Sequence, residues 1–134
     1  MGPHIARKTV KLLIQQDRRV SDAKVGIMGL TFKEDVPDLR NSKVPDIITE
    51  LREYGVEPLL HDPYADAEQA QEEYDLTLSR LDEFTDLDAL IFAVNHDEYM
   101  QQGPKICSKL RKGGVFIDVK SALSPDALRN DIRY

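Results

Sequence analysis

The sequence predicts an α/β fold in which a mostly parallel β-sheet is covered by helices on both faces. Short apolar runs alternate along the chain with segments of helical periodicity, which is typical of parallel strands joined by crossover helices. The runs are continuously apolar rather than alternating, as in strands that are buried on both faces. The length of 134 residues fits one domain with a single core.

The N-terminal part of the chain predicts a helix, a linker and a buried strand. Residues 4–16 carry apolar side chains at helical spacing, so we expect an amphipathic helix there. A polar linker over 15–23 follows, and Lys24–Leu30 is an apolar run that indicates a strand. The next segment, Thr31–Lys43, has about a dozen residues, whereas a loop between a strand and a helix usually has about 2–6. An ordered loop of this length is usually functional, and otherwise such a segment is disordered.

The helix expected after this loop has a recognisable start and end. Residues 44–51 place apolar side chains at positions i, i+3, i+4 and i+7, and Gly55 stands just past the end. Asn41 or Ser42 can cap its start, and Pro45 falls in the first turn, where its missing N–H costs little.

The second half of the chain predicts further strands separated by short helices and turns. Ala89–Val94 is the most continuous apolar run and gives the clearest strand. Gly113–Gly114 predicts a turn. The other expected elements are strands at Val56–His61, Leu76–Leu78 and Val115–Val119, helices at Ala65–Tyr74, Leu81–Leu87 and Pro104–Leu110, and a tail, Ser121–Tyr134, with a short helix near Pro125–Leu128.

Composition excludes several classes of protein. Charged residues make up 31% and hydrophobic residues 41%, as in ordinary soluble globular domains. No apolar run approaches the roughly 18 residues of a membrane span, so no membrane partner is expected. The net charge of −6 argues against nucleic-acid binding. Cys107 is the single cysteine, which excludes an internal disulfide and a multi-cysteine metal site and fits a reducing cytoplasm.

Candidate binding residues follow the predicted strands at their carboxyl ends, where open α/β sheets bind their ligands. In the first loop, Phe32 places a ring beside the charge of Lys33, and Arg40 offers a planar fork for a phosphate. Lys120 follows the last strand. Cations gathered at one edge of an acidic domain predict an anion site for a phosphate-bearing ligand. The other side chains expected at this edge are Lys43, Asp62, Tyr64, Asn95, His96 and Ser121.

The first loop also has a structural interpretation, which residue spacing leaves open. Phe32 would then cap the core, and Arg40 would pair with Asp35 or Asp38. In that case the basic segment 1–24 would be a solvated or partner-facing helix on an interaction domain.

Other kinds of chemistry are less well supported by the sequence. Gly26 and Gly29 lack the G-x-G-x-x-G spacing, so we do not expect a self-sufficient NAD site. Cys107 lies in a predicted helix and is interpreted as a core thiol. The three histidines show no metal-ligand spacing. His96 follows a strand, so it could contact a ligand, and a capping role for Asn95 or Asp97 ahead of the next helix is the alternative. Asp62–Pro63 is interpreted as a turn.

Several segments resemble one known family. Gly29–Val44 (GLTFKEDVPDLRNSKV) resembles the first loop of the C-terminal domain in the UDP-glucose/GDP-mannose dehydrogenase family, and its PDLRNSK wording is similar to the UDP-N-acetylhexosamine branch. Asp88–His96 (DALIFAVNH) and Gly114–Ser121 (GVFIDVKS) agree with this resemblance. Residues 1–14 resemble the helix that leads out of the family's middle dimerisation domain, and residues 121–134 resemble the family's tail.

The resemblance implies a Rossmann-like three-layer sandwich, with a mostly parallel sheet of about five strands preceded by an N-terminal helix. It implies that residues 1–23 are a helix and linker from the dimerisation domain, and that residues 24–134 are a nucleotide-sugar-binding domain. It also implies an enzyme that uses NAD to oxidise a UDP-hexose or UDP-N-acetylhexosamine to the uronic acid for polysaccharide biosynthesis. The intact enzyme is expected to be a cytoplasmic homo-oligomer.

The resemblance also implies roles for individual residues. Phe32 and Lys33 would face the UDP-sugar, and Arg40 would reach toward the NAD pyrophosphate. Lys120 stands where some relatives carry an arginine that contacts the substrate nucleotide. The family's glycine-rich NAD loop and catalytic cysteine segment are absent, and Cys107 does not occupy that motif. The chain is therefore expected to be a fragment that is inactive without the N-terminal and middle domains. A stand-alone nucleotide-binding or regulatory module and a structural interaction domain are the alternatives.

Overall fold

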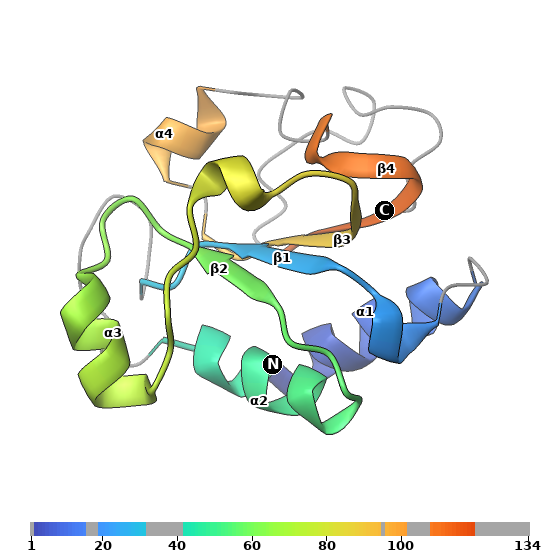
Figure 1. The fold of residues 1–134 in the computed structure, drawn as a ribbon, viewed down its shortest axis with the longest axis horizontal. Helices are drawn as coiled ribbons and strands as arrows, with labels where there is room; N and C mark the ends of the chain where they lie inside the picture. Colours follow the sequence, from blue (N-terminus) through green and yellow to red (C-terminus); the bar gives the residue numbers. More distant parts are fainter. Residues whose placement is uncertain (1, 16–18, 32–41, 95, 102–107, 120–134) are drawn as a thin grey trace.

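The computed structural model describes residues 2–15, 19–31, 42–94, 96–101 and 108–119. Within these residues, four parallel strands form one sheet in the order β2-β1-β3-β4 (Figure 1). The strands are β1 (Val25–Met28), β2 (Leu59–His61), β3 (Leu87–Phe92) and β4 (Leu110–Asp118). The helices are α1 (Gly2–Gln15), α2 (Val44–Glu53), α3 (Ala67–Tyr74) and α4 (Asp97–Met100), with 3₁₀ turns η1 (Val20–Asp22) and η2 (Leu81–Glu83). The predicted α/β fold with a parallel sheet is confirmed.

The order of the strands places the edge at which a ligand would bind. From β1 the chain passes to β2 on one side and then returns to β3 on the other side of β1. In register, Ile27 of β1 pairs with Leu60 of β2 and with Ile91 of β3, which in turn pairs with Ile117 of β4. The strand order therefore switches between β1 and β3, and their carboxyl ends mark the expected ligand edge.

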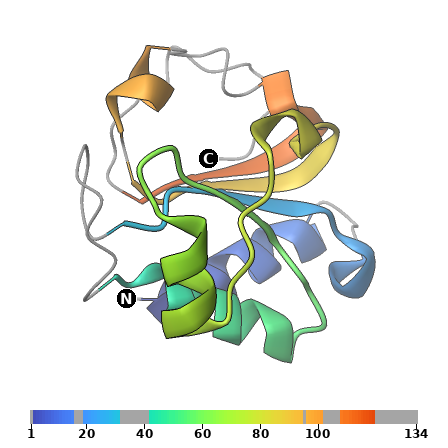
Figure 2. The same cartoon turned by 60° about the vertical axis from the view of Figure 1, so that its left-hand side comes forward.

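Helices cover both faces of the sheet, as predicted. α1 and α2 lie together against one face, while η2 and α4 lie on the other (Figures 1 and 2). On the first face, Ile27 and Ile91 belong to one core with Leu13 of α1 and Leu51 of α2. The core on the second face consists of Met28, Phe84, Leu87, Leu90, Phe92, Tyr99, Leu110 and Phe116. Neighbouring residues of a strand point to opposite faces, which explains why β1, and β3 apart from Asp88, are apolar without alternation.

α1 confirms the helix expected over residues 4–16. Its side chains Ile5, Ala6, Val10 and Leu13 are buried in the same core as the sheet. The hydroxyl of Thr9 is also buried, and it donates to the carbonyl oxygen of Ile5 at 2.9 Å, so its polarity is satisfied within the helix. None of the helices in the described part of the chain is long and apolar enough to span a membrane.

α2 also follows its sequence pattern. The apolar positions of residues 44–51 are buried, and Pro45 lies in the first turn as expected. The N-cap residue is Lys43, which makes no side-chain capping hydrogen bond, so the predicted cap at Ser42 was wrong by one residue. From the position before the N-cap, Oγ of Ser42 accepts from the backbone N–H of Val44 at 3.2 Å. Asn41 lies outside the described residues. At the other end, Gly55 adopts φ +84°, and the chain turns toward β2.

Two predictions in the middle of the chain were wrong. The strand expected at Val56–His61 begins only at Leu59. The N–H of Val56 is used by α2, because it donates to the carbonyl oxygen of Leu51 at 3.1 Å, and Pro58 has no N–H to pair. Leu76–Leu78 is not a strand, since the N–H of Leu76 donates to the carbonyl oxygen of Ala70 at the end of α3.

The predicted boundaries around β3 and β4 also need correction. Leu81–Leu87 is helical only over η2, and Leu87 already begins β3. Gly113–Gly114 lies inside β4 rather than in a turn, although the pairing of β4 with β3 is irregular between Leu110 and Val115. Leu110 is a strand residue, whereas the rest of the helix expected at Pro104–Leu110, including Cys107, lies largely outside the described residues. Ser121–Tyr134, with the helix near Pro125–Leu128, also lies outside them.

Candidate polar site at the carboxyl edge of the sheet

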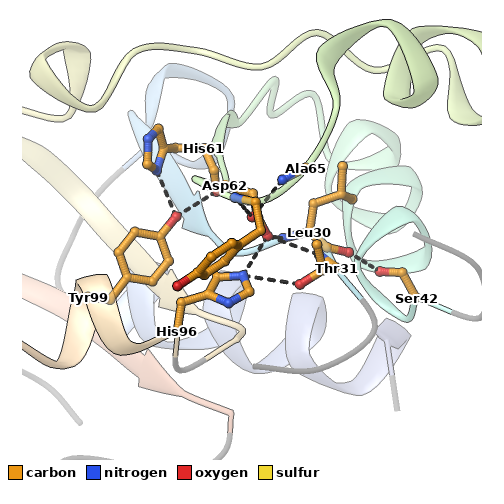
Figure 3. A network of polar contacts seen from close by, with 9 residues as sticks. Leu30, Thr31, Ser42, His61, Asp62, Ala65, His96 and Tyr99 are labelled. Carbon is orange, nitrogen blue, oxygen red and sulfur yellow. Dashed lines mark hydrogen bonds and ion pairs between the residues drawn. The ribbon is translucent and has the colours of Figure 1, made fainter. Parts of the chain in front are cut away.

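A buried polar network joins the carboxyl ends of three neighbouring strands. Leu30 and Thr31 follow β1, Asp62 follows β2, and His96 lies between β3 and α4. Figure 3 shows the side chains of Thr31, Asp62 and His96 converging, with the Asp62 carboxylate between the backbone after β1 and the His96 ring. The network therefore occupies the edge that the strand order marks for a ligand.

One oxygen of Asp62 builds the turn that the Asp62–Pro63 dipeptide predicts. Its Oδ1 accepts hydrogen bonds from the backbone N–H groups of Tyr64 at 2.7 Å and Ala65 at 3.1 Å. An aspartate that accepts from backbone groups two and three residues later is a common turn former. The predicted turn is confirmed, and it uses only one of the two carboxylate oxygens.

The other oxygen of Asp62 crosses to the neighbouring strands. Its Oδ2 accepts from the backbone N–H groups of Leu30 at 2.7 Å and Thr31 at 3.0 Å, and Nε2 of His96 lies 2.8 Å away. The Asp62 side chain is completely buried. This carboxylate thus holds the first residues of the long loop after β1, a role that the sequence did not reveal.

These contacts keep Asp62 ionised. Burial alone would raise the pKa of its carboxyl group. The hydrogen bonds from His96 and from the backbone of Leu30, Thr31 and Tyr64 outweigh burial and lower the pKa to about 2. Because an ionised carboxylate can only accept hydrogen bonds, Nε2 of His96 must carry the hydrogen between them.

His96 is enclosed by the network and by aromatic rings. Its exposed fraction is 0%, and the same Nε2 lies 3.1 Å from Oγ1 of Thr31. The ring of Tyr64 meets it edge-on with centroids 4.6 Å apart, and the ring of Tyr99 lies 5.7 Å away. In this enclosure Nε2 of the histidine faces Asp62 and Thr31.

A second pair extends the polar contacts along the β2 side. The hydroxyl of Tyr99 donates to the carbonyl oxygen of His61 at 2.9 Å, and Nδ1 of His61 lies 2.7 Å from the same hydroxyl. Burial is the largest influence on His61, and it lowers the pKa of the imidazole. Burial therefore favours the neutral form of His61, and Tyr99 is the partner of its Nδ1.

The two ends of the long first loop are tied together. Oγ of Ser42 donates to the carbonyl oxygen of Leu30 at 2.5 Å, while Asp62 binds the N–H of the same residue (Figure 3). The loop therefore leaves the sheet and returns to α2 at one fixed place. Its length was the sequence signal that pointed to this edge.

Gly26 of β1 and Gly29 just after it do not leave open space beside the backbone. A Cβ on Gly26 would lie 2.7 Å from the ring of Phe84, and one on Gly29 would lie 2.6 Å from Cβ of Val94. Protein atoms therefore fill the space beside both glycines, so neither leaves room for the close approach of a ligand. In the described part of the chain, no group of three His, Cys, Asp or Glu side chains could hold a metal ion.

The structure tests the predicted edge residues only in part. It brings together Asp62, Tyr64 and His96, and it places Lys43 exposed at the start of α2. The predicted binding residues Phe32, Lys33, Arg40 and Lys120, together with Asn95 and Ser121, lie outside the described residues. His96 is buried against Asp62, and His96 itself, rather than Asp97, occupies the N-cap position of α4, without a side-chain capping hydrogen bond. Whether His96 contacts a ligand stays a prediction.

Comparison with known sequences identifies relatives over nearly the whole chain. Residues 26–125 match the model of the UDP binding domain of the UDP-glucose/GDP-mannose dehydrogenase family. The chain is 39% identical over 134 residues to the UDP-N-acetyl-D-glucosamine 6-dehydrogenase of Pseudomonas aeruginosa, covering 99% of this chain and 31% of that protein. It is 38% identical over 128 residues to Protein CapL of Staphylococcus aureus, covering 96% of this chain and 30% of that protein. The chain thus spans about 30% of the length of these curated relatives.

Solved structures share the fold at lower sequence identity. An NDP-N-acetyl-D-galactosaminuronic acid dehydrogenase from Methanosarcina mazei Go1 aligns with a TM-score of 0.79 at 23% identity, over 92% of this chain and 26% of that one. A UDP-D-ManNAc dehydrogenase from Pyrococcus horikoshii aligns with a TM-score of 0.75 at 22% identity, over 98% of this chain and 30% of that one. The Rossmann-like fold expected from the sequence is therefore confirmed.

Proposed function

Because the chain belongs to the UDP-glucose/GDP-mannose dehydrogenase family, whose UDP binding domain it matches over residues 26–125, we propose that it binds the nucleotide of a UDP-sugar. The family match over most of the chain is the observation that carries this proposal. The site lies at the carboxyl edge of the sheet, between the loops that follow β1 and β3.

The fixed ends of the first loop support this location. Leu30 and Thr31 are held by Asp62, and Ser42 closes the loop against Leu30. Phe32, Lys33 and Arg40 stand between these ends in the sequence. In our proposal Phe32 and Lys33 contact the UDP-sugar, with Lys120 adding a second cation, and Arg40 approaches the pyrophosphate of NAD bound by another domain. Cations suit a diphosphate because charge-assisted hydrogen bonds to phosphate are strong.

The substrate we propose is a UDP-N-acetylhexosamine, which an NAD-dependent 6-dehydrogenase oxidises to the uronic acid for polysaccharide biosynthesis. The names of several relatives, which include UDP-N-acetyl-D-glucosamine and UDP-N-acetyl-D-mannosamine dehydrogenases, support this class of sugar. NAD and the catalytic cysteine would be contributed by N-terminal and middle domains in a cytoplasmic homo-oligomer. We expect this chain alone to show no NAD reduction with a UDP-sugar.

We also propose the domain division at residue 23, with residues 1–23 as a connection to the dimerisation domain and residues 24–134 as the nucleotide-sugar-binding domain. α1 buries one face against α2 and the sheet, so the connecting helix would be packed on the nucleotide-sugar-binding domain. Such a helix can transmit the position of one domain to the next.

An NMR titration of the chain with UDP tests the proposal, with NAD as a parallel ligand. We expect saturable shifts of the amide signals of Thr31, Ser42 and Val44 with UDP and none of comparable size with NAD. Lys33→Ala should weaken UDP binding by about tenfold, since it removes a charge contact to phosphate.

Lys24→Ala is the matched control for Lys33→Ala. Lys24 is an exposed lysine just before β1, at the opposite end of that strand, where its Nζ donates to the carbonyl oxygen of Thr85 at 2.6 Å. The substitution Lys24→Ala should leave the affinity for UDP unchanged. Absence of UDP shifts up to millimolar concentration would contradict nucleotide binding by this chain and favour an interaction domain instead.

A further inference from the structure

We propose that Asp62 and His96 are positioning residues of the UDP-sugar site: through Leu30 and Thr31, they fix where the substrate-binding loop leaves the sheet. This inference rests on the proposed function, because Phe32 and Lys33 directly follow Thr31 in the sequence. Neither residue needs to touch the ligand in this role. They act through the backbone that carries the binding side chains.

Asp62 holds two successive backbone groups at the start of the loop. Its Oδ2 accepts from the N–H groups of Leu30 at 2.7 Å and Thr31 at 3.0 Å. Because two successive N–H groups bind the same oxygen, the peptide groups of Leu30 and Thr31 must both point toward Asp62. A single hydrogen bond would leave one of these two peptide groups free to turn. The direction of the chain at Thr31 is therefore set by a residue that follows another strand.

His96 in turn fixes the carboxylate itself. Nε2 of His96 lies 2.8 Å from Oδ2 of Asp62 and 3.1 Å from Oγ1 of Thr31, so it contacts both partners of the backbone anchor. Its ring is packed against Tyr64 and Tyr99, which removes alternative orientations. The exits of β1, β2 and β3 consequently share one rigid set of hydrogen bonds.

The burial of a charged group at this place is better explained by positioning than by stability. Taking a carboxylate out of water is costly, and apolar packing of similar volume often stabilises a fold as well or better. A fully bonded polar network instead selects one geometry, because every donor must meet its acceptor. Binding sites need such support, since a group displaced by a fraction of an ångström loses much of its contribution.

The test measures the Kd for UDP of the 134-residue chain and of four variants, each checked for folding by its amide spectrum. Asp62→Asn places an NH₂ or a weaker acceptor against the N–H groups of Leu30 and Thr31. His96→Ala removes the donor, whereas His96→Gln keeps an N–H that can reach Asp62. We expect Asp62→Asn and His96→Ala to raise the Kd by about tenfold, and His96→Gln to stay within about twofold of the parent.

Asp88→Asn is the fourth variant and the matched control. Asp88 is also a buried carboxylate that accepts a backbone N–H next to β1, but it binds Lys24 at the other end of the strand, at 2.9 Å. The substitution should lower stability and leave the Kd for UDP within about twofold. Hydrogen exchange provides a second readout, since the amides of Leu30 and Thr31 should lose protection in Asp62→Asn and keep it in Asp88→Asn.

The outcomes separate the two proposals. If the parent chain binds UDP and Asp62→Asn and His96→Ala bind it equally well, the positioning role is wrong and the proposed function stands. An equal loss of UDP affinity in Asp62→Asn and Asp88→Asn would also overturn the positioning role, since general destabilisation would then explain both losses. If the parent chain does not bind UDP, the proposed function fails and the inference fails with it. Should Asp62→Asn not fold, the comparison of His96→Ala with His96→Gln decides.

Discussion

Asp62 and Asp88 accept backbone hydrogen bonds from opposite ends of the same central strand. Asp88 binds the N–H of Lys24, one residue before β1, at 2.9 Å, and its other oxygen pairs with Arg111 at 2.8 Å. Asp62 binds the N–H groups of Leu30 and Thr31 beyond the other end of β1. Each carboxylate comes from a neighbouring part of the sheet, so the chain is held just before and just after β1. The two ends have different roles, because only the Asp62 end leads into the candidate binding loop.

The first prediction concerns the contribution of Asp62 to stability. Asp62→Ala removes the acceptor of five donors and leaves buried N–H groups without a partner. We expect the free energy of unfolding to fall by about 3 kcal/mol, as measured by urea denaturation. Asp88→Ala should cost less, because its partner Arg111 is partly open to solvent. A loss below about 1 kcal/mol in Asp62→Ala would show that water replaces these hydrogen bonds.

The second prediction is a loss of stability in acid. The pKa of Asp62 is about 2 in the folded chain against a usual 3.8, so its stabilisation is present above pH 4 and is lost as the pH falls toward 2. This contribution is on the order of 2 kcal/mol. The pKa of His61 is lowered from its usual 6.5, so below that pH protonation favours the unfolded chain, and the loss is complete below the folded-state pKa.

Both groups therefore act in the same direction. Urea midpoints measured from about pH 8 to about pH 2 should decline gently below about pH 6.5 and more steeply below about pH 4. Asp62→Asn should remove the steep part of the decline while leaving the gentle part. An unchanged profile in that variant would mean that other carboxylates carry the acid sensitivity.

The third prediction concerns the close approach of β1 and β3 beside the site. Gly29 has φ +109°, and a Cβ there would lie 2.6 Å from Cβ and 2.7 Å from the backbone nitrogen of Val94. Gly29→Ala should therefore cost about 3 kcal/mol or more, from backbone strain and a clash with main chain. Gly55 also has a positive φ, of 84°, but it is exposed, so Gly55→Ala should cost only about 1 kcal/mol. Equal losses in thermal or urea unfolding would indicate that β3 yields to the added methyl group.

The fourth prediction concerns the start of α3. Oδ1 of Asp66 accepts from the backbone N–H groups of Glu68 at 2.8 Å and Gln69 at 3.2 Å, as a helix N-cap. Asp66→Ala should lower the free energy of unfolding by about 1 kcal/mol, and Asp66→Ser should recover most of it. Neither variant should change UDP binding, because Asp66 has no part in the network of Asp62 and His96. A change in the Kd for UDP would place α3 at the binding site.

Local patterns predicted the elements whose burial is regular. The helical spacing of residues 44–51 and the apolar run in β3 correspond directly to buried faces in the structure. The predicted start of β2 was wrong, because the N–H of Val56 is bonded at the end of α2. The hydropathy of a residue does not show where its backbone N–H is bonded. The turn expected at Gly113–Gly114 lies inside β4, in the stretch between Leu110 and Val115 where the pairing with β3 is irregular, and local glycine preference does not reveal such an irregularity within a strand.

The sequence predicted where the residues of the candidate site lie in the fold, but it did not predict which of them bind one another. Both Asp62 and His96 follow predicted strands, and this order along the chain was enough to place them at the ligand edge. Their mutual hydrogen bond depends on the strand order and on the depth at which each side chain is buried. A dipeptide such as Asp62–Pro63 indicates the local turn made by one oxygen and carries no information about the other.

The hydrogen bond between Ser42 and Leu30 separates the architecture of the sheet from the content of the first loop. Since Asp62 and Ser42 both hold Leu30, where that loop begins, we expect changes of sequence or length between Thr31 and Ser42 to leave the strands in place. The entropic cost of closing a longer segment grows only slowly with length. The sequence of this loop can therefore change, by design or in evolution, independently of the residues of the hydrophobic core.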